Sequence, residues 1–330
     1  MELDGKLLAI TGIGGFIGLR TAERALQRGM RVRGLDMSEP AAVRARKAGA
    51  DVVVGDVTSP SAVRDLCRGA DIVLHTAAIV HESGSMDEFR RVNVGGTVNV
   101  CENAREAGAK AFVQLSSVMV YGFTFPPYVT ETGPLRGENN PYCQTKIESE
   151  EAALRYNQPP RFGVIVIRPG DVYGPGSVPW VVRPAKLMRK RQFGLPGGGQ
   201  GIMNHVYVDN LIDAIFLALE HEMWGETFNV TDGADTTFRS YFTRLAKAVG
   251  APRPYSVPLP LVKGIAWIMQ KSAVLLGREP QVSPDAIAFL NRPYPYSIEK
   301  ARKLLGYEPR VTLDEGMART ALWLQEAGRN

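Results

Sequence analysis

The chain has 330 residues, of which 45% are hydrophobic and 22% are charged. This composition is typical of a soluble globular protein and excludes a wholly disordered chain, and the length favours two domains or one large domain with an insertion. Basic residues exceed acidic ones by only five. No zinc-finger, helix-turn-helix or RNA-binding signature accompanies them, so we expect no nucleic-acid partner.

The first half of the chain alternates short apolar segments with helical patterns. The apolar segments are rich in Val and Ile and predict strands buried on both faces; they are Lys6–Ile10, Arg31–Leu35, Asp51–Val54, Ile72–His75, Ala111–Leu115 and Gly163–Arg168. Helical patterns lie between them, at Phe16–Arg28, Phe89–Ala107 and Tyr142–Tyr156. This alternation predicts an α/β fold with a doubly wound parallel Rossmann sheet.

After Gly170 the pattern changes, because prolines and glycines become frequent and regular alternation ends. A strand and helix around His205–Glu220 are expected to return to the sheet. Helices separated by prolines follow, ending in an amphipathic pattern at Leu313–Leu324. We therefore predict an NAD-binding domain of residues 1–174 and about 205–232, and a smaller, mostly helical substrate-binding portion of about 175–204 and 233–330.

The three cysteines, Cys67, Cys101 and Cys143, are scattered and form no metal-ligand spacing. They indicate a reducing cytoplasm and no metal. No signal peptide is recognisable at the N-terminus. The most apolar later stretch, Leu261–Leu276, is interrupted by lysines and a glutamine and falls short of a membrane-spanning helix. We therefore expect a cytoplasmic protein without an integral membrane span.

The first strand runs into a glycine-rich turn, Thr11–Gly18, and then into a helix. Gly12 permits the tight turn, Gly15 lets the backbone approach a pyrophosphate, and Gly18 allows close packing of the helix on the strand. Unpaired amides and the helix dipole favour phosphates at such a helix start. The strand–turn–helix context therefore predicts a dinucleotide site.

Asp36 follows the second strand, 24 residues after Gly12. A carboxylate at this point can accept hydrogen bonds from an adenosine ribose, and it repels a 2′-phosphate, which favours NAD over NADP. A solvated loop aspartate is the alternative interpretation. Arg31 and Arg33 lie nearby, and strand alternation leaves open whether either faces the ribose.

Tyr142 and Lys146 are four residues apart, so a helix would place both on one face. An ammonium near a phenol favours the phenolate and lowers the phenol's pKa. A tyrosine tuned in this way can take a proton from an alcohol as hydride leaves, or return it in reduction. Without the glycine turn the pair would be interpreted as an ordinary surface pair.

Together these features resemble the extended short-chain dehydrogenase/reductase superfamily. Further segments match it in chain order, namely Asp56–Val57, His75–Ala78, Asn93–Thr97, Ser116–Gly122, Arg168–Gly170 and Leu305–Pro309. The resemblance implies a homodimer formed through two of the expected helices, Phe89–Ala107 and Tyr142–Tyr156.

The resemblance also implies residue roles. Ser117 would hydrogen-bond the substrate oxygen, Tyr142 would be the acid/base, and Lys146 would tune Tyr142 and hold the nicotinamide ribose. Ser116 is a weaker candidate than Ser117. For Asn93, a helix-packing or backbone-bonding role and a proton-relay role both stay open. Arg168 can equally be interpreted as a structural ion-pair partner. The implied cofactor contacts are Gly12, Gly15, Phe16, Ile17, Gly18, Asp36, Asp56, Val57, Thr76, Ala77, Ala78, Asn93, Lys146 and Arg168.

Members of the superfamily either interconvert stable alcohols and ketones or epimerise and dehydrate nucleotide sugars. Sugar-nucleotide members usually carry an arginine where this chain has Met203, and a thioether cannot neutralise a diphosphate. The segments Pro258–Leu276 and Ser297–Pro309 are similar to the 3β-hydroxysteroid dehydrogenase branch. An apolar helix over the cleft would suit an apolar substrate or peripheral membrane contact, although a packed core helix is the alternative.

We therefore expect an NAD-dependent oxidoreductase that interconverts a secondary alcohol and ketone on an apolar substrate, either steroid-like or a β-hydroxy/β-keto compound. A nucleotide-sugar epimerase or dehydratase is the alternative, which basic residues within Arg183–Arg191 support. A non-catalytic nucleotide-sensing protein is the third hypothesis, and the presence of Ser117, Tyr142 and Lys146 argues against it.

Overall fold

The computed structural model describes residues 1–80, 84–137, 140–262, 264 and 288–327. Seven strands form one parallel sheet in the order β10-β6-β5-β4-β1-β2-β3. The strands are β1 (Leu7–Thr11), β2 (Arg31–Asp36), β3 (Asp51–Val54), β4 (Ile72–His75), β5 (Ala111–Leu115), β6 (Gly163–Pro169) and β10 (Thr227–Val230). The predicted Rossmann-like α/β fold is confirmed.

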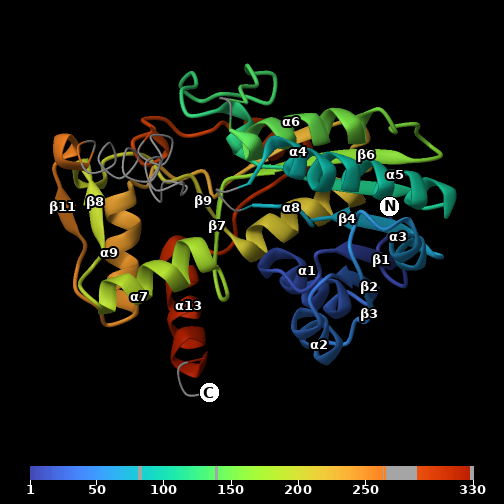
Figure 1. Cartoon of the computed structure of the whole chain (residues 1–330), viewed down its shortest axis with the longest axis horizontal. Helices are drawn as coiled ribbons and strands as arrows, with labels where there is room; N and C mark the ends of the chain where they lie inside the picture. Colours follow the sequence, from blue (N-terminus) through green and yellow to red (C-terminus); the bar gives the residue numbers. More distant parts are fainter. Residues whose placement is uncertain (81–83, 138–139, 263, 265–287, 328–330) are drawn as a thin grey trace.

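Helices cover both faces of this sheet (Figure 1). One face packs against α1 (Phe16–Gln27), α2 (Glu39–Lys47) and α8 (Val208–Glu220). The other packs against α3 (Pro60–Cys67), α5 (Gly95–Glu106) and α6 (Pro141–Leu154). The helix expected over Phe89–Ala107 is divided into α4 (Met86–Phe89), a π-helical turn at Arg90–Val94, and α5. Asn93 lies in the π-helical turn, a feature often found at functional sites.

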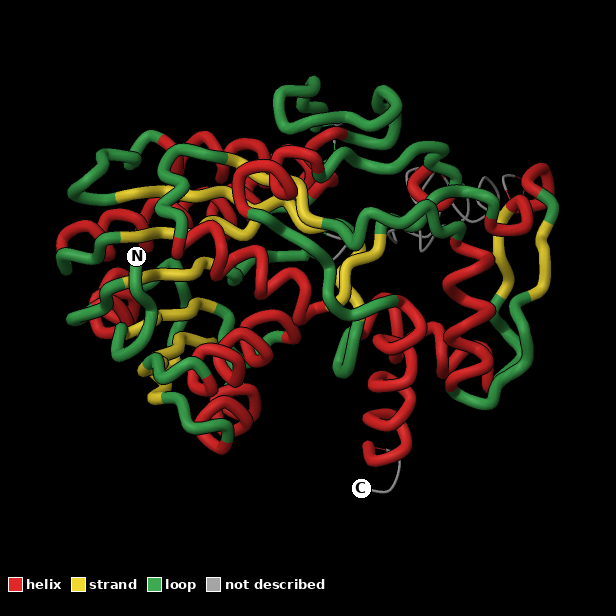
Figure 2. Tube along the Cα trace, turned by 180° about the vertical axis from the view of Figure 1, so that it is seen from behind, coloured by secondary structure: helices red, strands yellow, loops and turns green. Residues whose placement is uncertain are grey.

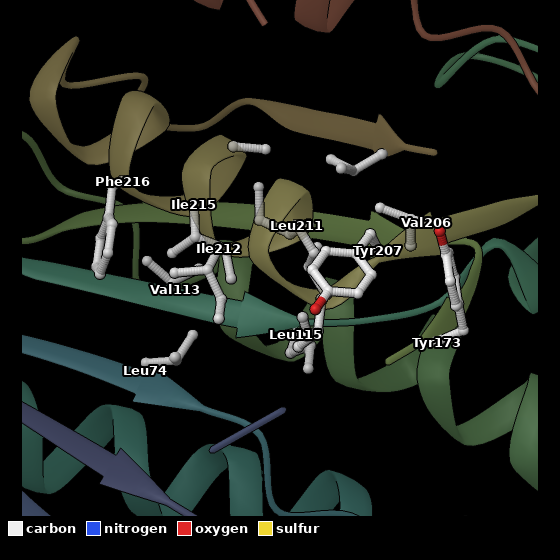
Figure 3. Close-up of a cluster of buried hydrophobic side chains, with 14 of the residues drawn as sticks. Leu74, Val113, Leu115, Tyr173, Val206, Tyr207, Leu211, Ile212, Ile215 and Phe216 are labelled. Carbon is white, nitrogen blue, oxygen red and sulfur yellow. The ribbon is translucent and has the colours of Figure 1, made fainter. Parts of the chain in front are cut away.

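The core between α8 and the sheet is shown in Figure 3. Leu211, Ile212 and Ile215 of α8 are each at most 1% exposed, and they pack against Leu74 and Val113 of the sheet. Full burial of one such side chain contributes about 1.5–3 kcal/mol. This packing fixes α8, and with it the segment that leads into α8, against the carboxyl ends of the strands.

The strand expected near His205 does not return to the main sheet. β9 (His205–Tyr207) instead pairs with β7 (Asp171–Tyr173) in a separate two-stranded sheet, and β10 takes the edge position beside β6. Where the chain leaves the main sheet after β6, Asp171 N donates to the Asn204 carbonyl at 2.8 Å. An added Cβ on Gly170 would lie 2.1 Å from the same carbonyl oxygen, so only glycine allows this close pairing.

The rest of the C-terminal portion contains a parallel pair of strands and several helices. Its elements are α7 (Arg183–Arg189), β8 (Gly194–Pro196), α9 (Phe238–Ala248), β11 (Tyr255–Val257), α12 (Glu299–Leu305) and α13 (Leu313–Ala327). Figures 1 and 2 show α7, α9, β8 and β11 at the end of the molecule opposite β1. Most of the expected apolar helix Leu261–Leu276 lies outside the described residues. None of the helices in the described ranges is long and apolar enough to cross a membrane.

Candidate active site

A cleft of about 710 Å³ opens at the carboxyl ends of the parallel strands. Ligands bind at this edge of open α/β sheets, where the strand order reverses between β1 and β4. The structure brings most of the predicted site residues together here. Those in the cleft lining are Gly12, Gly15, Phe16, Ile17, Gly18, Asp36, Thr76, Ala77, Ala78, Ser117, Tyr142 and Lys146.

The glycine turn has the geometry that a dinucleotide site requires. Gly12 has φ +66°, and its amide donates to the Leu35 carbonyl at 2.7 Å. A Cβ on Gly18 would lie 2.4 Å from the Gly12 carbonyl oxygen, so only glycine allows this approach of helix and turn. Gly15 precedes α1, and no side chain caps the helix start. The first amides of α1 therefore face the cleft as an anion site.

Asp36 lies at the end of β2 and is held by two backbone amides. Its Oδ2 accepts from Gly14 N at 2.9 Å and its Oδ1 from Ser38 N at 3.0 Å. Each carboxylate oxygen has further lone pairs that ribose hydroxyls can use. Arg33 is one of the two nearby cations whose orientation the sequence left open, and its Nε donates to Asp51 Oδ2 at 3.0 Å.

Hydrogen bonds between the ends of β1 and β4 fix the wall on either side of the strand-order reversal. The Thr76 hydroxyl donates to the Thr11 carbonyl at 2.6 Å, and Ala77 N donates to Thr11 Oγ1 at 3.2 Å. The buried Thr11 hydroxyl also pairs with His75 Nδ1 at 2.7 Å. These contacts position the backbone of Thr76 and Ala77 beside the glycine turn.

Asn93 is a predicted cofactor contact that lies outside the cleft lining. Its Oδ1 accepts from Ile79 N at 2.7 Å, and its Nδ2 donates to Thr145 Oγ1 at 3.0 Å. Asn93 therefore ties the segment after β4 to the helix that carries Lys146. Of the two roles open from sequence, these contacts support the packing role.

Asp56 and Val57 also lie outside the lining. The Asp56 carboxylate accepts from Thr58 N at 2.8 Å, which closes the turn before α3. Val57 is buried in the core under α3 and α5.

Arg168 lies outside the lining as well, because it is buried in an ion pair. Its Nε and Nη2 donate to the two carboxylate oxygens of Glu150 at 2.9 and 2.6 Å, and its Nη1 donates to the Tyr121 hydroxyl at 2.7 Å. Glu150 also accepts from the Ser116 hydroxyl. Ser116 also lines the cleft, but its hydroxyl is engaged by the buried Glu150.

Ser117, Tyr142 and Lys146 converge on one part of the cleft. Asn140 caps α6 through Oδ1, which accepts from Tyr142 N at 3.0 Å and so sets Tyr142 in the first helical turn. The Tyr142 phenol hydrogen-bonds the Ser117 side chain. Lys146 Nζ donates to the Leu115 carbonyl at 2.8 Å and lies 5.9 Å from the centre of the Tyr142 ring.

The predicted lowering of the Tyr142 pKa is not found. Burial raises the pKa of Tyr142 to about 12, although the hydrogen bond from Ser117 opposes this shift. Burial also lowers the pKa of Lys146 to about 8, against the opposing effect of Glu150. The Lys146 ammonium is bound to the Leu115 carbonyl and lies beside the ring, so desolvation dominates at the phenol.

The other half of the cleft is largely apolar, and the sequence did not reveal it. Trp180 and Phe289 stack with ring centres 5.9 Å apart, and Leu290 extends their surface. Two charged residues, Asp171 and Arg183, also line the cleft. Asp171 directly follows the Arg168–Gly170 segment, and Arg183 begins the basic Arg183–Arg191 stretch; these were the available signals in the sequence. Phe289 and Leu290 reach the cleft only through tertiary folding.

Comparisons with known proteins agree with this geometry. A family model described as "NAD dependent epimerase/dehydratase family" matches residues 8–231. A 4-hydroxy-2-methyl-3-oxo-4-farnesyl-3,4-dihydroquinoline-1-oxide ketoreductase of Stigmatella aurantiaca is 29% identical over 93% of both chains. Mouse sterol-4-alpha-carboxylate 3-dehydrogenase, decarboxylating, is 28% identical over 96% of this chain and 90% of its own length.

Two further similarities involve another curated relative and a solved structure. The 2-alkyl-3-oxoalkanoate reductase of Stenotrophomonas maltophilia is 29% identical over 94% of this chain and 97% of its own length. The solved structure of UDP-glucose 4-epimerase from Thermotoga maritima has a TM-score of 0.79 at 22% identity, covering 98% of this chain and 99% of that chain. The last likeness is one of fold.

Proposed function

Because the chain belongs to the NAD-dependent epimerase/dehydratase family, we propose that it is an NAD(H)-dependent oxidoreductase that interconverts a secondary alcohol and a ketone on an apolar substrate. The observation that carries this proposal is the convergence of Ser117, Tyr142 and Lys146 in one cleft with the glycine turn. The apolar wall of Trp180 and Phe289 supports an apolar substrate.

We propose that the two ends of the cleft hold different molecules. The glycine turn, the uncapped start of α1 and the Asp36 carboxylate fit a dinucleotide, and Asp36 favours NAD over NADP. The nicotinamide ring supplies or accepts the hydride when it is bound. Residues 1–174 and about 205–232 would hold this cofactor, and residues of about 175–204 and 233–330 would hold the substrate.

The chain's own residues supply the proton transfer. The Ser117 hydroxyl would donate to the substrate oxygen and stabilise the charge that develops there. Tyr142 would give a proton to a ketone oxygen or take one from an alcohol. Since burial holds the pKa of Tyr142 at about 12, the phenol keeps its proton at neutral pH and is ready for reduction. Lys146 would hold the ribose hydroxyls while the Leu115 carbonyl fixes its Nζ.

A nucleotide-sugar epimerase or dehydratase is the second candidate, and the exposed Arg183 in the cleft lining favours it. Met203 argues against it, because this residue is 0% exposed and packs in the core. The position where sugar-nucleotide members carry a cation thus offers no charge to a diphosphate.

The test is NADH formation by the purified protein with NAD and a panel of hydroxysteroids and β-hydroxy acids. UDP- and dTDP-sugars are run beside them with product analysis, because epimerisation leaves no net NADH. Turnover of an apolar alcohol is expected. Sugar conversion without net NADH would replace the proposal by the second candidate, and tight NAD binding without any turnover would favour a nucleotide-sensing protein.

Tyr142→Phe removes the proton donor while leaving the shape of the site nearly unchanged. We expect it to abolish most turnover, with an NAD Kd close to that of the wild type. Tyr128→Phe is the matched control, because Tyr128 is exposed and lies outside the cleft lining. Undiminished turnover in Tyr142→Phe would contradict the assigned role.

A further inference from the structure

The charged residues in the cleft lining differ in whether they have partners. Within the described part of the chain they are Asp36, Lys146, Asp171 and Arg183. Two backbone amides hold Asp36, a backbone carbonyl accepts from Lys146, and a buried arginine pairs with Asp171. Among the residues that the structure describes, Arg183 has no ion-pair or hydrogen-bond partner. Its positive charge is therefore the unpaired one among the described lining residues.

Arg183 belongs to the apolar half of the cleft. It begins α7, directly after the π-helical turn Val178–Val182 that contains Trp180, and both residues line the cleft. Trp180 stacks on Phe289, and Pro179 and Leu290 also line this region. A guanidinium beside an apolar wall suits a ligand with an anionic head group and an apolar body.

Asp171, the negative lining residue nearby in the chain, does not cancel this charge. Its carboxylate pairs with the Arg292 guanidinium, and both side chains are at most 5% exposed. The Arg292 guanidinium in turn lies 4.0 Å from the Phe289 ring centre. The Asp171–Arg292 pair thus has no net charge, and its guanidinium packs against the Phe289 ring of the apolar wall. Arg183 is left as the unpaired charge among the described residues of this half of the cleft.

We propose that Arg183 binds a carboxylate of the substrate, so that the enzyme acts on apolar hydroxy or oxo acids in preference to neutral alcohols and ketones. This inference rests on the proposed oxidoreductase function and names its substrate class. A guanidinium binds a carboxylate through two parallel hydrogen bonds, which gives both affinity and orientation. The names of two relatives, a sterol-4-alpha-carboxylate dehydrogenase and a 3-oxoalkanoate reductase, describe acids of this kind.

The experiment compares long-chain 3-hydroxy acids and hydroxysteroid carboxylates with their methyl esters, in the wild type and in Arg183→Met. We expect the wild type to favour the acids in kcat/KM. Arg183→Met should raise KM for the acids roughly 10-fold or more, the effect of losing a hydrogen-bonded charge partner, with little change for the esters. Arg183→Lys should restore part of the preference, because it keeps the charge without the two-pronged geometry.

The matched control is Lys186→Met, since Lys186 is an exposed cation on the same helix and does not line the cleft. It should leave the acid preference unchanged. An acid preference that survives in Arg183→Met overturns the inference. A weakened NAD Kd together with an unchanged acid preference also overturns it, because Arg183 would then serve the cofactor diphosphate. Loss of UDP-sugar conversion in Arg183→Met would assign the residue to a nucleotide sugar instead.

Binding of dodecanoate to the NAD-loaded protein, measured by calorimetry, separates this inference from the proposed function. Equal turnover of acid and ester leaves the oxidoreductase function standing and overturns the inference. Dodecanoate binding that depends on Arg183, without turnover of any alcohol, supports the acid site and overturns the oxidoreductase function. Absence of both binding and turnover overturns both.

Discussion

Lys146 offers a stringent test of the site, because the residue should be required for turnover while its buried charge should destabilise the folded protein. Burial lowers the pKa of Lys146 from 10.5 to about 8. A shift of one unit corresponds to about 1.4 kcal/mol, so holding the ammonium in the fold costs about 3 kcal/mol at pH 7. Lys146→Met removes this cost.

The substitution also removes the hydrogen bond from Lys146 Nζ to the Leu115 carbonyl. Leu115 lines the cleft, so water can replace the donor, and the loss is about 1 kcal/mol. The net prediction is that Lys146→Met raises the free energy of unfolding by roughly 2 kcal/mol at pH 7 and abolishes turnover.

The pH dependence follows from the lowered pKa. Between about pH 8 and 10.5 the folded wild type loses its Lys146 proton while the unfolded chain keeps it, so the unfolded state binds more protons. Wild-type stability from this group therefore rises with pH in this window, and the advantage of Lys146→Met shrinks. Urea denaturation of cofactor-free protein at several pH values measures both effects, with the exposed Lys110→Met as control. A variant less stable than the wild type at pH 7, or a gap that does not shrink as the pH rises, would refute this reasoning.

The cofactor end of the cleft gives two further predictions. Asp36→Ala should weaken NAD binding and lower the NAD-to-NADP preference about 10-fold, since it removes the ribose acceptor and the charge that repels a 2′-phosphate; titration of both cofactors checks this, and the exposed Asp51→Ala should change neither. Gly18→Ala should cost about 1–3 kcal/mol and weaken NAD binding, because its Cβ would lie 2.4 Å from a carbonyl oxygen. Gly95→Ala, whose Cβ would meet its nearest atom at 3.7 Å, should be tolerated, and an equal loss in both glycine variants would argue against the role of the turn.

Much of the sheet was predictable because its strands are buried on both faces and therefore read as continuous apolar runs. The glycine turn was predictable for another reason, because the glycines are required by local sterics. A side chain at Gly18, for example, would clash with the Gly12 carbonyl. The position of β9 was not predictable. Its pairing with β7 instead of the main sheet involves residues about 34 apart in the chain, including the close approach of Gly170 to Asn204, and such pairing leaves no local sequence pattern.

The site shows the same division between local and tertiary information. Helical spacing correctly indicated that Tyr142 and Lys146 belong to one helix. It could not show that Lys146 Nζ is bound to the Leu115 carbonyl, or that burial sets the Tyr142 pKa. The apolar wall was beyond the sequence pattern, because Trp180 and Phe289 meet only in the folded chain.

The homodimer expected from the resemblance stays a prediction, and light scattering on the purified protein measures it. The central claim concerns hydride and proton transfer on an apolar alcohol. The most direct measurement is the absorbance of NADH after an apolar hydroxy acid deuterated at the carbinol carbon is mixed with NAD-loaded protein, with mass analysis of the cofactor. The account predicts deuterium in the NADH formed by the wild type and almost none with Tyr142→Phe. NADH without deuterium, or equal NADH formation by both proteins, would contradict it.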